Sequence, residues 1–161
     1  MGRGEGSGTR KAKSRDRTLL MGQRFWRQAE SDLRVARRLV QPDSYYVAAN
    51  LAHQAAEKAL KAAHWHLKGQ EPAWKHSLMA MADVLVADYG DIPTRVREAL
   101  SLLAPIYEHS RYPSGNVNDP IPADAIETDV AQAAIKAAED VMTWVGPLLK
   151  EPPERAPSKT N

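Results

Sequence analysis

The sequence predicts an all-α fold, an up-and-down antiparallel helical bundle of about five helices. Five segments repeat apolar residues at helical spacing, and none alternates apolar and polar residues over the length of a strand. Proline or glycine lies at most of the breaks between these segments, and the breaks are short except for the one after Arg111. Consecutive helices joined by short loops are typical of antiparallel bundles.

The first two helices are expected on either side of a break at Pro42. The first runs from about Gln23 to Val40, with apolar residues on one side and charged residues, mostly arginines, largely on the other. Pro42 ends it because proline disfavours a helical residue before it. The second runs from about Tyr45 to Lys68 and is capped by Gly69. Its many alanines allow close approach of neighbouring helices, which predicts that this helix is central.

The later helices are bounded by glycine and proline in the same way. The third is expected from about Ser77 to Tyr89, before Gly90. The fourth opens with Pro93, as proline prefers, and reaches Arg111 with a kink at Pro105. An extended loop over 114–122 follows. The last helix runs from about Ala123 to Val145 and is ended by Gly146 and Pro147.

Charge divides the chain into three regions: a basic flexible N-terminal arm over 1–22, the helical bundle over 23–149, and a disordered tail over 150–161. The net charge of the whole chain is +2. Residues 1–24 carry +5, so the remaining residues carry −3. The arm is either a solvated leader or a contact for nucleic acid or another acidic partner. The body is expected to lack the basic face of a dedicated nucleic-acid binder.

Composition predicts a cytoplasmic protein without a metal or cofactor. There is no cysteine, so disulfides, thiolate metal sites and thiol nucleophiles are excluded. No apolar run approaches the ~18 residues that a membrane span needs, and residues 1–22 lack the apolar core of a signal peptide. His64 and His66 lie about 200° apart on a helix and cannot share an ion. No glycine-rich phosphate loop follows a strand.

A polar stripe on the second helix and an arginine near the end of the fourth are the candidate site. The stripe consists of Gln54, Glu57, Lys58 and Lys61, which the 100° step of a helix places on one narrow edge. Arg111 precedes Tyr112 and Pro113. Together they predict either a phosphate-binding site or an ionic contact that locks two helices.

Four stretches of the chain resemble the HEPN domain, named for higher-eukaryote and prokaryote nucleotide binding. They span residues 25–149 and occur in the order found in that family. The stretches are Ala29-Glu-Ser-Asp-Leu33 with Ala36, Gln54-Ala-Ala-Glu-Lys-Ala-Leu-Lys61, His76-Ser-Leu78, and Tyr107 with Ser110-Arg-Tyr-Pro113.

The resemblance implies an all-α bundle that forms a homodimer. Many members are metal-independent ribonucleases, often toxins paired with a minimal nucleotidyltransferase antitoxin. Their signature is an arginine followed, after four to six residues, by a histidine. Arg111 occupies the arginine position, but the histidine positions hold Asn116, Val117 and Asn118. His76 or His109 would have to replace that histidine through space.

The sequence therefore predicts a non-catalytic module that binds a nucleotide, an RNA phosphate or a partner protein. The expected ligand-binding residues are Arg111, Tyr112, Lys58, Lys61, Glu57 and Gln54. The alternative is a metal-independent ribonuclease of the toxin–antitoxin type, with Arg111 and His76 as catalytic residues. A third possibility is a structural dimer in which Arg111 pairs with Glu57.

Overall fold

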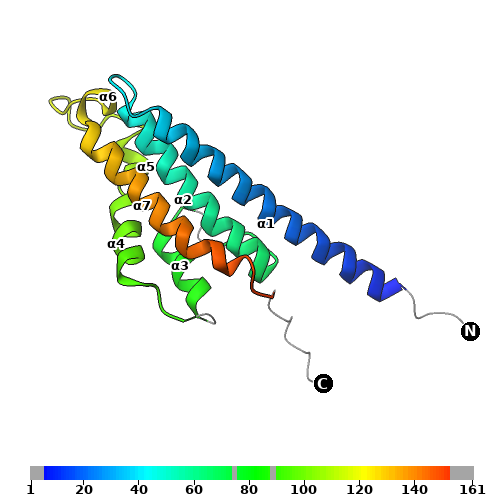
Figure 1. Cartoon of the computed structure of the whole chain (residues 1–161). Helices are drawn as coiled ribbons and strands as arrows, with labels where there is room; N and C mark the ends of the chain where they lie inside the picture. The colour runs from blue at the N-terminus through cyan, green and yellow to red at the C-terminus, as the bar shows by residue number, and fades with distance from the viewer. Residues whose placement is uncertain (1–5, 74–75, 88–89, 153–161) are drawn as a thin grey trace, which may run out of the picture.

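The computed structural model describes residues 6–73, 76–87 and 90–152, which form an all-α bundle without strands (Figure 1). The predicted fold class is therefore confirmed. This part of the chain contains seven helices, two of them a single turn long. They are α1 (Gly6–Arg38), α2 (Tyr45–Lys68), α3 (Leu78–Val86), α4 (Thr94–Leu103), α5 (Ile106–His109), α6 (Pro122–Ala125) and α7 (Thr128–Leu148).

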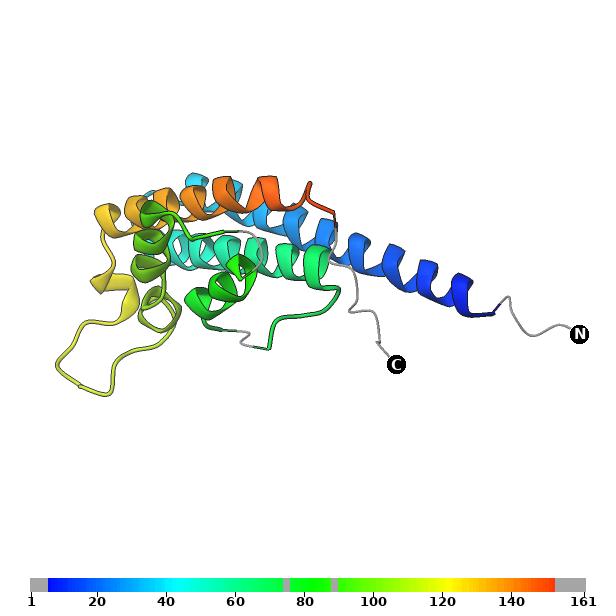
Figure 2. The same cartoon turned by 90° about the horizontal axis from the view of Figure 1, so that it is seen from below.

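Helix α2 is the central helix, as its alanine content predicts. It packs against α1, α3, α5, α6 and α7. Figure 2 shows α1 and α7 along one side of α2, with α3 and α5 on another. The alanines of α2 that face its neighbours are fully buried: Ala48, Ala49, Ala52, Ala55, Ala56, Ala59, Ala62 and Ala63. Small side chains bring helix axes toward the ~8 Å end of the packing range, so this helix forms the core of the bundle.

Gly22 shows how closely α1 and α2 approach each other. A Cβ atom at this position would lie 3.1 Å from the carbonyl oxygen of Ala62 and 3.4 Å from the Cβ of His66. Any larger residue would push the two helices apart. The contact continues toward the N-terminus as far as Thr18, whose methyl carbon lies 3.7 Å from a Cβ built on Gly69.

The expected start of the first helix, near Gln23, is wrong. Helix α1 begins at Gly6, so the predicted flexible arm is helical from that residue onward and continues without a break into the bundle. Its N-terminal part projects beyond the other helices (Figures 1 and 2). The basic residues of the arm and those of residues 23–38 therefore lie on one helix.

Other helix bounds also differ from the expected ones. Pro105 separates α4 from α5 instead of only kinking one helix. The last predicted helix is divided into α6 and α7, and α7 passes through Pro147 to Leu148 instead of ending before it. Helix α2 has the predicted bounds, with Gly69 in the left-handed conformation at φ 70°. Helix α3 ends at Val86, and Tyr89 lies outside the described residues.

No helix in the described ranges is both long enough and apolar enough to cross a membrane.

Candidate functional site

Three side chains that can carry positive charge surround the ring of Tyr107 on α5. The guanidinium carbon of Arg111 lies 4.5 Å from the ring centroid. The rings of His53 and His76 lie 5.5 Å and 5.6 Å from it, centroid to centroid. His53 comes from α2 and His76 from the segment just before α3. We call these four residues the Tyr107 cluster.

Ser110 fixes the end of α5 against α2. Its hydroxyl donates to the carbonyl oxygen of Ile106 at 2.6 Å and accepts from the side-chain amide of Asn50 at 3.0 Å. Ser110 is buried, so these bonds are shielded from water. The break at Pro105 starts the short helix, and Ser110 ends it in contact with α2. Arg111 therefore follows an anchored residue although its own side chain is exposed.

The guanidinium of Arg111 has no carboxylate partner among the described residues. It lies over the face of Tyr107, within the ~6 Å at which a cation is attracted to an aromatic ring. The predicted alternative in which Arg111 pairs with Glu57 is therefore wrong for this structure. Glu57 pairs with Lys61 instead.

His53 is a buried histidine with unused hydrogen-bonding groups. It is 1% exposed, and neither ring nitrogen has a hydrogen-bond partner. Burial lowers the pKa of His53 below its ordinary value of 6.5. Glu57 opposes this shift, whereas the charges of Arg111, His76 and Lys58 add to it. His53 is therefore neutral at pH 7.

Glu57 connects His53 with Lys61 along one edge of α2. Its Oε1 accepts from the Lys61 ammonium at 2.7 Å. Its Oε2 has no hydrogen-bond partner and lies 3.9 Å from Nδ1 of His53. Both Glu57 and Lys61 have little exposed side chain, so their charges compensate each other in a poorly hydrated place.

The other half of the predicted stripe faces α1. Lys58 forms an ion pair with Asp32 and donates to the side-chain oxygen of Gln54 at 3.2 Å. The second carboxylate oxygen of Asp32 accepts from Gln28 at 2.7 Å. The structure thus divides the stripe: Glu57 and Lys61 lie on the side of His53, and Gln54 and Lys58 connect α2 to α1.

Tyr112 and His109 do not contact the Tyr107 ring in the described structure. Both line an open cavity of about 620 Å³ bounded by Glu108 and residues of the segment 113–125. Tyr112 is 63% exposed. Of the two histidines proposed to replace the missing one, the structure therefore brings His76, and not His109, to the ring beside Arg111.

The remaining histidines bond to backbone carbonyls away from this ring. His64 pairs with the carbonyl oxygen of Met81 at 2.9 Å, and His66 with that of Glu151 at 2.8 Å. Burial lowers the pKa of His64 as well. Its hydrogen bond to Met81 opposes this shift, and the charge of Lys68 adds to it. Within the described ranges, no three His, Asp or Glu side chains lie together in a way that could hold a metal ion.

Sequence reasoning did not select His53, Tyr107, Asn50 or Ser110 for the site. His53 stands one turn before Glu57, and Tyr107 one turn before Arg111, so helical spacing was an available signal for both. Asn50 and Ser110 are 60 residues apart, and no local pattern connects them.

Comparisons with known proteins agree with this architecture. A family model described as the HEPN domain matches residues 23–151. The crystal structure of TT1696 from Thermus thermophilus is 30% identical, with a TM-score of 0.65, and the match covers 79% of this chain and 97% of that one. The crystal structure of ST0689, an archaeal HEPN homologue, is 25% identical, with a TM-score of 0.63 and coverage of 80% and 97%. A search of curated proteins gave no match.

Proposed function

This chain belongs to the HEPN domain family, and we propose that it binds the phosphate of a nucleotide or of RNA at the Tyr107 cluster without cleaving it. One observation carries the proposal: Arg111 lies over Tyr107 with no carboxylate partner in the described part of the chain. An arginine without an acidic partner keeps its charge and its fork of donors for a ligand. Phosphate is the anion that this fork binds through two parallel hydrogen bonds.

Contact with the Tyr107 ring would restrict the side-chain conformation of Arg111 before a ligand binds. With its guanidinium carbon over the face of the ring, Arg111 would keep the N–H groups at the edge of the guanidinium for a ligand. His76 is exposed and contacts the same ring, so it would supply a second donor from α3's side. Less side-chain freedom is then lost when the ligand binds, which increases affinity.

We assign the other predicted ligand residues to different roles. Lys61 and Lys58 are already compensated by Glu57 and Asp32, so they would orient α2 more than they would attract phosphate. Gln54 assists Lys58. The exposed ring of Tyr112, next to Arg111, would offer a surface on which a base stacks, an interaction worth ~1–3 kcal/mol per base.

Calorimetric titration with adenosine 5′-monophosphate and with a short single-stranded RNA tests this site. Arg111→Ala should weaken binding roughly 10- to 100-fold, because a hydrogen bond to a charged group contributes ~1.5–3 kcal/mol. Its melting temperature should stay near that of the parent, since the side chain is exposed. Arg97→Ala is the matched control, because Arg97 is also an exposed arginine and lies on α4, away from the ring. Unchanged affinity in Arg111→Ala would refute the proposal.

A metal-independent ribonuclease is the second candidate, favoured by the meeting of Arg111 and His76 at one ring. His76 would take the proton of the RNA 2′-hydroxyl, whose oxygen would then attack phosphorus. Arg111 would stabilise the charged phosphorane. The bond to the 5′-oxygen would break, and that oxygen would receive the proton held by His76, which leaves a 2′,3′-cyclic phosphate and a free 5′-hydroxyl.

Incubation of RNA with the purified protein and a chelator distinguishes the two candidates. Binding without cleavage at high protein concentration would support the non-catalytic module. Cleavage that is lost in His76→Ala and retained in His109→Ala would establish the ribonuclease. The ends of the RNA products should then be analysed. Ends with 2′,3′-cyclic phosphates exclude a contaminating nuclease that leaves other ends.

Homodimerisation and a minimal nucleotidyltransferase partner stay proposals that rest on family membership. Light scattering on the purified chain measures the first. Co-purification with the product of a neighbouring nucleotidyltransferase gene, where one exists, measures the second. The predicted cytoplasmic location also stays a prediction.

A further inference from the structure

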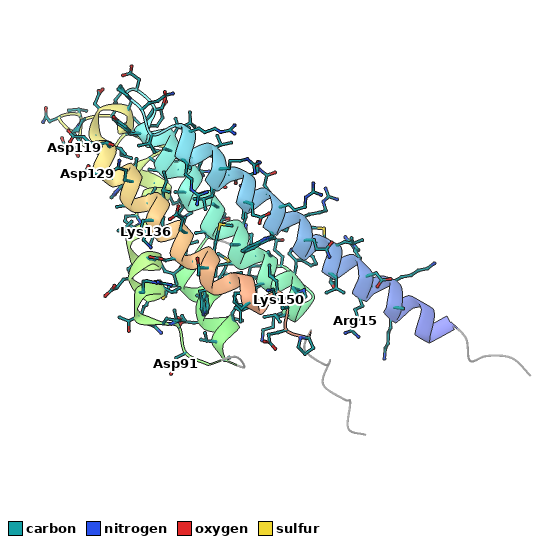
Figure 3. All side chains as sticks on the ribbon, viewed as in Figure 1. Arg15, Asp91, Asp119, Asp129, Lys136 and Lys150 are labelled. Atoms are coloured by element: carbon teal, nitrogen blue, oxygen red, sulfur yellow. The ribbon has the colours of Figure 1, made fainter. Side chains whose placement is uncertain are left out.

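The side of α1 that faces away from the bundle carries six basic side chains. We call this the α1 basic surface. It consists of Lys13, Arg17, Arg24, Arg27, Arg34 and Arg38, all of which are exposed. Figure 3 shows the side chains of α1 extending away from the other helices, with Arg15 labelled on its projecting part. This surface shares no residue with the Tyr107 cluster.

The geometry of the helix aligns these residues. At 100° per residue they fall within an arc of roughly 100°, opposite the side on which Ala29, Leu33 and Ala36 are buried. The row extends over 25 residue steps, or about 37 Å at 1.5 Å per residue. A rigid helix therefore presents one charged edge along its length.

The charges of this surface are not compensated by ion pairs. None of the six residues contacts a carboxylate among the described residues. Arg37, on another side of α1, is different: it bonds to Glu139 of α7 at 2.7 Å. The acidic residues of α1 are Asp16, Glu30 and Asp32, and none of them pairs with the row among the described residues.

Part of the surface is hollowed in a way that suits a phosphate group. An open cavity of about 450 Å³ is lined by Arg24, Arg27, Gln28, Glu30, Ser31 and Arg34. Arg34 donates to the hydroxyl of Ser31 at 3.1 Å, which holds its guanidinium against this cavity. The lining carries three guanidinium groups against a single carboxylate, so its net charge is positive.

We propose that the α1 basic surface binds the phosphate backbone of duplex DNA without sequence preference. A convex helix edge fits the major groove of B-form DNA, about 12 Å wide, whereas the major groove of duplex RNA is too narrow for it. The row contains no aromatic residue, so it lacks the stacking surface that single strands use.

A membrane surface is a poorer match for this face. Helices that lie in a membrane interface bury a broad apolar side. The exposed large apolar side chains of α1 are Leu20 and Val35 alone among the described residues. The apolar side of residues 22–38 is already packed against the bundle. This second surface goes beyond the proposed phosphate site and does not depend on it.

Fluorescence anisotropy of a labelled 20-base-pair DNA duplex tests the proposal on the full chain. Affinity of the parent should fall with salt at a logarithmic slope near −5, as expected of about six phosphate contacts. Changing Arg24, Arg27 and Arg34 together to glutamine should reduce the magnitude of the slope by about three and weaken binding on the order of 100-fold at 0.1 M salt. Circular dichroism and thermal melting should be unchanged, because all three side chains are exposed.

The matched control removes the same charge from another face. Arg95, Arg97 and Lys136 on α4 and α7 are exposed, and Lys136 lies far from Arg15 in Figure 3. Their triple glutamine variant should bind the duplex less than threefold more weakly than the parent. Three results overturn the proposal: no binding by the parent, equal losses in the two triple variants, or single-stranded RNA bound as tightly as the duplex.

Discussion

The Tyr107 cluster and the α1 basic surface both present arginines, but they hold them in different ways. Arg111 lies over the ring of Tyr107, which two histidines from other segments also contact, and it follows an anchored serine. The residues of the α1 basic surface lie along one exposed edge of a helix, and no ion pair restrains them within the described residues. A preorganised arginine can therefore recognise the shape of one phosphate. A row of basic residues without ion pairs instead responds to the density of phosphate charges on its ligand.

Salt should separate the two surfaces most strongly. Between 50 and 200 mM salt, binding of duplex DNA by α1 should weaken by about 10³-fold, because about six counterions are released per complex. Binding of adenosine 5′-monophosphate at Arg111 involves a single phosphate group and should change only a few-fold. Anisotropy and calorimetry measured across this range give the two slopes. Equal slopes would remove the distinction between the sites.

Replacement of arginine by lysine should have the next largest effect. Arg111→Lys keeps the charge but loses the planar fork and its stacking on Tyr107, so nucleotide affinity should fall about tenfold. The triple change of Arg24, Arg27 and Arg34 to lysine keeps the charge density, and DNA affinity should fall less than threefold. Calorimetry and anisotropy measure these effects. Full nucleotide affinity in the Arg111→Lys variant would show that charge alone suffices there.

Removal of the serine anchor should affect the Tyr107 cluster alone. Ser110→Ala removes two hydrogen bonds and leaves the amide of Asn50 without its partner. The free energy of unfolding should fall by about 1–2 kcal/mol, the cost of a buried unsatisfied donor. Urea denaturation measures this loss. Nucleotide affinity should drop roughly threefold, and DNA affinity should not move; a stable variant with unaltered nucleotide binding contradicts the positioning role.

Acid should destabilise the bundle through its buried histidines. The pKa values of His53 and His64 are lowered in the folded state, so the unfolded chain takes up protons at a higher pH than the folded one. Their contribution to stability is full above pH 6.5 and is lost as the pH falls through the folded pKa values. Urea denaturation from pH 8 to pH 5 should show this decline, and His53→Gln should reduce it. An identical decline in that variant would show that His53 titrates normally.

Local patterns gave the correct bounds and buried side of α2 but not the start of α1. The bounds of α2, the cap at Gly69 and the inward alanines follow from helical spacing. The same spacing would have revealed the α1 basic surface. The predicted boundary between the arm and the bundle at residue 22, however, divided its basic residues between two regions. The glycines and serines of residues 6–14 have weak helix propensity, which is why the start at Gly6 was missed.

The candidate site was predicted only in part because it depends on contacts between distant segments. Arg111 and His76 were selected, and the structure brings them to one ring. Tyr107 as the centre and His53 as a buried neighbour required knowledge of how α5 lies on α2. The division of the stripe between α1 and His53 also depends on where α1 packs. Sequence spacing places residues on a face but does not say which neighbour covers it.

Side-chain NMR during titration with adenosine 5′-monophosphate is the decisive test of the phosphate site. We expect the Nε–H resonance of Arg111 and the ring resonances of His76 and Tyr107 to shift together and to saturate at one ligand per chain. The arginine resonances of α1 should stay in place at 0.15 M salt. Shifts confined to α1, or a saturating titration in which Arg111 does not move, would contradict the assignment of the phosphate site to the Tyr107 cluster.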